Sequence, residues 1–144
     1  MSESQALQQS VNQIAGREVI ETDKYAARLQ EMQSLLLEIA ATQELYAPDA
    51  ANHGRVLTAC MKRVPEVQAI WSNHTDGTFI YSEPPAGLMN AKRRDWWNGA
   101  MNEGEYVSSP YVSAITKRSC ITLSRAIKNG QGETVGVVGI DLAV

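Results

Sequence analysis

Apolar residues recur at helical spacing through the first third of the chain. They lie three or four residues apart from Leu7 to Ile14 and again from Tyr25 to Ile39, which is the repeat of one face of an α-helix. The segment from about 4 to 46 contains no proline and one glycine, Gly16. The pattern therefore predicts one long helix, or two helices in line.

The part of this helix before Thr22 is mostly polar and carries only a narrow apolar stripe. Such a helix is marginal on its own. Two interpretations stay open: a stalk that pairs with a second copy and carries a signal along its axis, or a frayed end of an excised fragment. We expect a helical stalk over 1–24, a homodimer formed through it, and one domain over 25–144.

The pattern after Pro48-Asp49 changes to shorter elements. Helices are predicted over 50–64 and from Arg93 to about Asn102, and strands over 67–73, 78–82, 111–115, 120–127 and 134–142. Turn residues at 74–77 and 129–132 join neighbouring strands. The order predicts an α+β fold, in which a long N-terminal helix and shorter helices pack on a mostly antiparallel sheet of about five strands.

The last predicted strand has two unlike faces. Side chains alternate across a strand, so Gly136, Val138, Ile140 and Leu142 form an apolar face, expected under the long helix. Asp141 lies on the other face, together with Gly139. The preceding strand adds the small residues Cys120, Thr122, Ser124 and Ala126 on one of its faces. A carboxylate in such a strand is costly without a partner, so we expect Asp141 to face a small-molecule cavity.

Composition narrows the possible functions. The 144 residues carry a net charge of −3, which argues against nucleic acid as a partner. No apolar stretch reaches the roughly 18 residues of a membrane span, and no secretory signal is evident. Cys60 and Cys120 are expected to be buried thiols. Neither histidine has neighbours at metal-ligand spacing, so we expect no metal, no cofactor and no enzymatic activity.

Four pieces of sequence in the second half together resemble a known family. They are Arg94-Asp95-Trp96-Trp97, Ser109-Pro110-Tyr111-Val112-Ser113, the run 121–127 and the closing run 136–141. In this order the set is similar to the Cache sensor family, whose members are PAS-like periplasmic sensor domains. The resemblance implies the extracytoplasmic part of a bacterial membrane receptor: a chemotaxis receptor, a histidine kinase or a diguanylate cyclase. The chain looks like a single-Cache form.

The resemblance also implies a ligand and its contacts. One branch of the family binds amino acids, and its binding residues correspond here to Arg94, Trp96, Trp97, Tyr111 and Asp141. Tyr81 and Arg125 are further candidates. Trp97 stands where that branch usually has a tyrosine, and Gly99 where it has an aspartate. The expected ligand is an amino acid, a carboxylate or a similar small polar metabolite.

Two other functions stay open from the sequence. The first is an interaction module without a cavity, in which Asp141 pairs with Arg125 or Arg94. The second is a small hydrolase that uses Cys60 or a histidine. The chain could also be a complete cytoplasmic protein rather than part of a receptor.

Overall fold

The computed structural model describes residues 26–113 and 117–143. The predicted stalk, and with it the dimer expected through residues 1–24, lies outside the described residues. A helix covers 26–40 and is followed by the 3-10 helix η1 (Gln43–Leu45). The prediction that this helix continues to about residue 46 is wrong. The chain leaves the α-helix at Thr42, whose hydroxyl bonds back to the Glu38 carbonyl at 3.1 Å, and the turn that follows buries Leu45.

The remaining elements are two helices and six strands. They are α2 (Ala50–Arg63), β1 (Val67–Asn73), β2 (Phe79–Glu83), α3 (Asp95–Glu103), β3 (Glu105–Val107), β4 (Tyr111–Val112), β5 (Ser119–Lys128) and β6 (Thr134–Ala143). The strands form one sheet in the order β2-β1-β6-β5-β3, with β4 also paired to β5. Every pairing is antiparallel. The predicted α+β fold is confirmed, with six strands in place of about five.

Local sequence explains where α2 begins and ends. The Asp49 carboxylate accepts hydrogen bonds from two backbone amides of the first turn, at 2.9 and 3.1 Å, as an N-cap should. The helix ends at Arg63, because Pro65 disfavours a helical conformation at Val64. The predicted helix over 50–64 is therefore confirmed within one residue.

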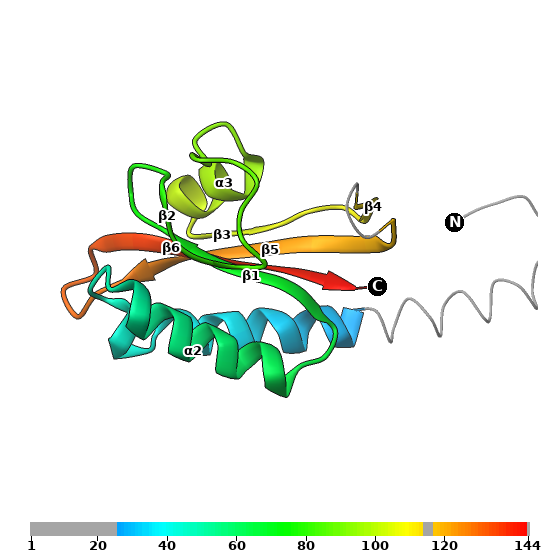
Figure 1. The fold of residues 1–144 in the computed structure, drawn as a ribbon, viewed down its shortest axis with the longest axis horizontal. Helices are drawn as coiled ribbons and strands as arrows, with labels where there is room; N and C mark the ends of the chain where they lie inside the picture. Colours follow the sequence, from blue (N-terminus) through cyan, green and yellow to red (C-terminus); the bar gives the residue numbers. More distant parts are fainter. Residues whose placement is uncertain (1–25, 114–116, 144) are drawn as a thin grey trace, which may run out of the picture. The chain divides into compact units, whose positions relative to one another are not determined.

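The sheet separates two layers of helix. The helix residues 34–40 and α2 cover one face, while α3 lies over the other (Figure 1). The first face carries the apolar set predicted for β6, and β5 adds three more; the buried members are Val138, Ile140, Leu142, Ile121, Leu123 and Ile127. Leu36 and Ile39 of the helix and Leu57 of α2 are buried as well. The sequence-based assignment of this face to the core is confirmed.

Two boundaries differ from prediction, and one strand was not predicted. Helix α3 begins at Asp95 rather than Arg93, because Arg94 has an extended backbone and forms the N-cap. Strand β3 was not expected; it follows Gly104, which ends α3 with a φ of +91°. Strand β4 covers two residues and ends before Ser113, and positions 114 and 115 of the predicted strand over 111–115 lie outside the described residues. Short edge strands such as these carry too few residues to show an alternating pattern.

A buried histidine ties α2 to the turn before it. His53 is 0% exposed, and its Nε2 lies 2.9 Å from the Ala47 carbonyl and 3.1 Å from that of Leu45. A carbonyl can only accept, so Nε2 carries the hydrogen. Nδ1 then accepts from the hydroxyl of Ser72 in β1, at 2.7 Å. Burial lowers the pKa of His53, and the hydrogen bonds to the two carbonyls oppose this.

Candidate ligand-binding site

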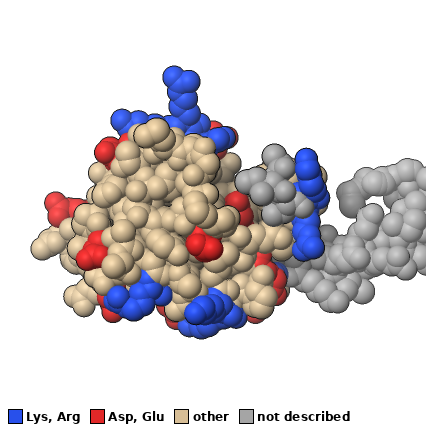
Figure 2. Space-filling model, viewed as in Figure 1, with Lys and Arg blue, Asp and Glu red and all other residues tan. Residues whose placement is uncertain are grey.

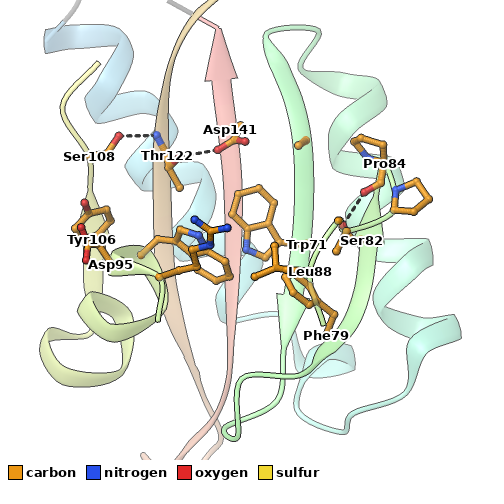
Figure 3. Close-up of a pocket in the computed structure, with 16 residues that line it drawn as sticks. Trp71, Phe79, Ser82, Pro84, Leu88, Asp95, Tyr106, Ser108, Thr122 and Asp141 are labelled. Atoms are coloured by element: carbon orange, nitrogen blue, oxygen red, sulfur yellow. Dashed lines mark hydrogen bonds between the residues drawn. The ribbon is translucent and has the colours of Figure 1, made fainter. Parts of the chain in front are cut away.

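A cavity of about 380 Å³ lies on the face of the sheet that carries α3. This volume falls in the usual range for small-molecule sites. The lining residues come from five strands, the loop after β2 and the start of α3 (Figure 3); they are Ala69, Trp71, Phe79, Ser82, Pro84, Pro85, Ala86, Gly87, Leu88, Arg94, Asp95, Trp96, Tyr106, Ser108, Thr122 and Asp141. Sheet residues thus form its base, and a loop and a helix start form its sides.

Asp141 enters the cavity from β6. Its register partner in β5 is Thr122, and the Thr122 hydroxyl donates to Asp141 Oδ1 at 2.7 Å. Burial raises the pKa of Asp141 above its usual value, while the hydrogen bonds from Thr122 and Tyr111 oppose the shift. Among the described residues Asp141 forms no ion pair. The carboxylate is therefore held in place by hydroxyls and left without a countercharge.

Tyr111 supports this carboxylate from the short edge strand β4. Its hydroxyl lies 2.8 Å from Thr122 Oγ1 and 3.5 Å from Asp141 Oδ1. Because the Thr122 hydrogen is used on Asp141, Tyr111 is the donor to Thr122. Burial raises the pKa of Tyr111 to about 12, so the phenol keeps its proton. The residue as a whole is 43% exposed and is not part of the cavity lining.

Arg94 and Asp95 line the cavity where α3 begins, and both are exposed. The Asn98 side chain donates to the carbonyls of Lys92 and Arg94, at 2.7 and 3.0 Å, and so fixes the backbone at this point. The Arg94 guanidinium forms no ion pair among the described residues. A fork of donors is thus available to an anionic group of a ligand.

Trp96 is held over the sheet by a hydrogen bond to its backbone carbonyl. The Ser124 hydroxyl, on β5, donates to the Trp96 backbone carbonyl at 2.6 Å. The indole then packs against Trp71, with ring centroids 5.1 Å apart, and against Phe79, at 6.3 Å. Both distances lie in the range of favourable aromatic pairs. The three rings form one continuous aromatic wall of the cavity.

Three residues predicted for the site lie elsewhere. Tyr81 turns to the α2 side, where its hydroxyl lies 3.0 Å from that of Thr58. Arg125 follows Ser124 in β5, and the Ser124 hydroxyl reaches Trp96 on the α3 side of the sheet, so alternation turns Arg125 to the opposite face. Its guanidinium pairs there with Glu105 at 2.8 Å. Trp97 does not line the cavity, and its Nε1 is buried without a partner among the described residues.

The interaction module without a cavity is not what the structure contains. Asp141 pairs with neither Arg125 nor Arg94, and a cavity lies beside it. The hydrolase alternative finds no support at Cys60, whose pKa is raised by burial. Cys60 and Cys120 are both buried free thiols, as expected.

Gly99 packs against Tyr106 so closely that an added Cβ would lie 2.6 Å from the ring.

Sequence reasoning missed the apolar part of the site. Trp71, Phe79 and Leu88 all line the cavity. Trp71 could have been placed by alternation, since Ala69 and Trp71 share a face of β1, but the sequence does not reveal that β1 pairs with β6. Leu88 lies in a loop, where no periodicity marks the inward-facing residue.

Surface charge, metal ligands and membrane-spanning helices can each be assessed for the described residues. On the face seen in Figure 2, the coloured basic and acidic side chains are interspersed rather than gathered by sign. No group of three His, Cys, Asp or Glu residues within 26–113 and 117–143 could hold a metal ion. The same residues include no helix with the length and apolarity needed to cross a bilayer.

A family model matches most of the described part of this chain. Residues 48–144 match the family model described as methyl-accepting chemotaxis protein-like, first PDC sensor domain. A search of curated proteins finds no match.

Several solved structures share the fold. The ligand-binding domain of the Pseudomonas aeruginosa amino acid chemoreceptor PctC, in complex with GABA, has a TM-score of 0.76 and 21% identity, over 92% of this chain and 61% of its own. The domain of the Pseudomonas fluorescens chemoreceptor CtaA with L-isoleucine has a TM-score of 0.68 and 23% identity, over 96% and 58%. The same domain with L-valine has a TM-score of 0.64 and 25% identity, over 81% and 53%. The chain thus spans less than two thirds of each of these solved chains.

Proposed function

Because the chain belongs to the methyl-accepting chemotaxis protein-like family of first PDC sensor domains, we propose that its cavity binds an amino acid. The observation that carries the proposal is the Asp141 carboxylate, which lies in the cavity without a cation partner among the described residues. The solved relatives named above hold GABA, L-isoleucine and L-valine, each with one amine and one carboxylate.

Asp141 is the group that receives the ammonium of the ligand. Thr122 donates to one oxygen, Oδ1, and the Tyr111 hydroxyl, which donates to Thr122, lies 3.5 Å from the same oxygen, which leaves Oδ2 for an incoming donor. Burial of an unpaired carboxylate is unfavourable, as the raised pKa of Asp141 indicates. An ammonium that enters the cavity removes this penalty and gains a charge-assisted hydrogen bond.

Arg94 is the group that receives the ligand carboxylate. Its guanidinium can form two parallel hydrogen bonds with a carboxylate. Trp96, which lines the same cavity, carries an indole N–H that can only donate and so suits a carboxylate oxygen. The site therefore offers an acceptor to an amine and donors to an acid, the two groups that all α-amino acids share.

The test is a thermal-shift screen of the purified chain against the standard amino acids, followed by calorimetry. A ligand at about 100 times its Kd should stabilise the domain by about 2.7 kcal/mol. The best binder is then compared with its analogue that lacks the amine and with its analogue that lacks the carboxylate. We expect both analogues to bind at least tenfold more weakly.

Two variants test whether Asp141 binds the amine of the ligand. Asp141→Asn should weaken binding by about 30-fold or more, since removal of one partner of a buried charge pair costs about 2–5 kcal/mol. Asp95→Asn is the matched control, because it removes an exposed carboxylate from the same cavity. Equal losses in both variants, or an amine-free analogue that binds as tightly as the amino acid, would refute the role of Asp141.

We further propose that this domain lies on the extracytoplasmic side of a membrane receptor and acts in signalling as a binding domain, not as an enzyme. We also keep the proposal of a homodimer formed through the N-terminal helix. Light scattering on a version that lacks 1–22 tests it: a monomer is expected, and an unchanged dimer would contradict the stalk as the contact.

A further inference from the structure

The cavity has a polar end and an apolar end. Ser108, Thr122 and Asp141 lie toward one end of the strands, and Trp71, Phe79 and Leu88 lie toward the other (Figure 3). The charged residues of the lining are Arg94, Asp95 and Asp141, so the aromatic wall contributes no charge. Asp95 and Ser82 lie at the sides of the cavity, level with Trp71 and Leu88 (Figure 3), so the apolar surface is the one formed by the aromatic side chains and Leu88 themselves.

Trp71 presents carbon rather than nitrogen to the cavity. It faces Gly139 across the β1–β6 pair, and a Cβ added to Gly139 would lie 2.6 Å from the indole Nε1 and from Cε2. Nε1 is buried and has no partner among the described residues. The one polar atom of the ring is thus pressed onto the sheet, where no ligand can reach it.

The neighbours of Trp71 extend the same apolar surface. Trp96 packs against Trp71 and Phe79 packs against Trp96, both with tilted rings, and Leu88 reaches in from the loop after β2. A charged or hydrogen-bonding group placed against Trp71, Phe79 and Leu88 would lose its water and gain no partner from these three side chains. An aliphatic group of similar shape would gain burial.

We propose that Trp71, seated on Gly139, forms the floor of a side-chain subsite that selects amino acids with an apolar side chain over polar or charged ones of the same shape. This inference rests on the proposed function, since the ammonium at Asp141 and the carboxylate at Arg94 set the direction in which the ligand side chain points. Gly139 is a specificity-determining position in this arrangement, because the absence of a side chain there sets the depth of the subsite.

The test is calorimetry with ligands of matched shape. L-Leucine, L-asparagine and L-aspartate branch in the same way at the γ position but differ in polarity and charge, and L-alanine lacks the branch. We expect leucine to bind at least tenfold more tightly than asparagine, aspartate and alanine. Each methylene buried in an apolar pocket contributes enough for a several-fold gain.

Variants locate the preference in the floor of the cavity. Gly139→Ala pushes the Trp71 ring off the sheet and into the subsite, so leucine should lose at least tenfold in affinity and alanine less than threefold. Gly130→Ala is the matched control, because a Cβ at this turn glycine meets nothing within 4 Å. Phe79→Ala, which opens the wall instead of filling it, should also reduce the leucine-to-alanine ratio.

The outcomes separate the two proposals. If asparagine or aspartate binds as tightly as leucine, the apolar subsite is refuted while amino acid binding stands. If none of the standard amino acids binds the unaltered chain, the proposed function falls, and the subsite falls with it. If Gly139→Ala does not fold, the ligand series on the unaltered chain and the Phe79→Ala variant still decide the question.

Discussion

Acid should destabilise this domain through His53. The ring is fully buried in the neutral form, with Nε2–H given to two carbonyls and Nδ1 accepting from Ser72. Burial lowers its pKa, and so does nearby His74 to a smaller degree, whereas the two carbonyl hydrogen bonds and Asp49 raise it. The folded pKa therefore lies below the unfolded value of 6.5.

The sign of the pH dependence follows from proton binding. A base whose pKa is lowered by folding binds fewer protons in the folded state, so protonation favours the unfolded chain. The contribution of His53 to stability is complete above pH 6.5 and is lost as the pH falls toward the folded pKa. The slope is at most about 1.4 kcal/mol per pH unit. By pH 5.5 the loss approaches about 1.4 kcal/mol if the folded histidine stays neutral.

The assay is urea unfolding of the unaltered chain and of His53→Gln at pH 7.5, 6.5 and 5.5. Glutamine can still donate to the carbonyls but does not titrate, so all other groups cancel in the difference. At pH 7.5 the variant should be less stable by about 1–3 kcal/mol, because the Ser72 hydroxyl loses its acceptor. The gap should narrow by about 1 kcal/mol at pH 5.5. Parallel pH profiles for the two proteins would refute the reasoning.

Three further predictions concern stability without ligand. Asp141→Asn should raise the melting temperature at pH 7.5, because the raised pKa of Asp141 means that its ionised form disfavours the fold. The gain should shrink as the pH falls below the folded pKa and be lost below the unfolded value of 3.8, and a loss of stability at pH 7.5 would contradict this. Gly136→Ala should destabilise by several kcal/mol, since an added Cβ would lie 2.6 Å from the backbone oxygen of Asn73, whereas Gly130→Ala should change the urea midpoint little. Asp49→Ala should lower the free energy of unfolding by about 0.5–2 kcal/mol through loss of the α2 N-cap, checked by the same urea titration.

The parts of the fold that could be predicted are those whose residues alternate or recur over enough positions. The run 135–142 shows eight alternating positions on two unlike faces, and the structure has β6 over Thr134–Ala143. Strands β3 and β4 are three and two residues long, so their existence depends on pairing with β5 and not on their own pattern. The first helix ends where the Thr42 hydroxyl bonds to the Glu38 carbonyl and Leu45 becomes buried. The helix propensities of the residues do not predict either contact.

The site was predictable where residue chemistry was unusual for its position. Asp141 is out of place in an apolar strand, and Arg94 and Trp96 belong to a motif, so the sequence singled them out; the structure places all three at one cavity. Arg125 was assigned by charge alone, but its register position next to Ser124 turns it to the other face. Its partner there, Glu105, belongs to the strand that was not predicted.

Strand β6 gives the domain its core and its site from one alternating sequence. Ile140 and Leu142 are buried against the helical layer, and this fixes the direction in which Gly139 and Asp141 point. A slip of one residue would bury the carboxylate in the core and expose the isoleucine, so the register is strongly determined. The buried apolar face of β6 therefore sets the direction of both residues, and the contacts with Thr122 and Trp71 then fix their surroundings. Because the core determines this register, β6 can carry on its other face a glycine that Trp71 covers and a carboxylate without an ion pair among the described residues.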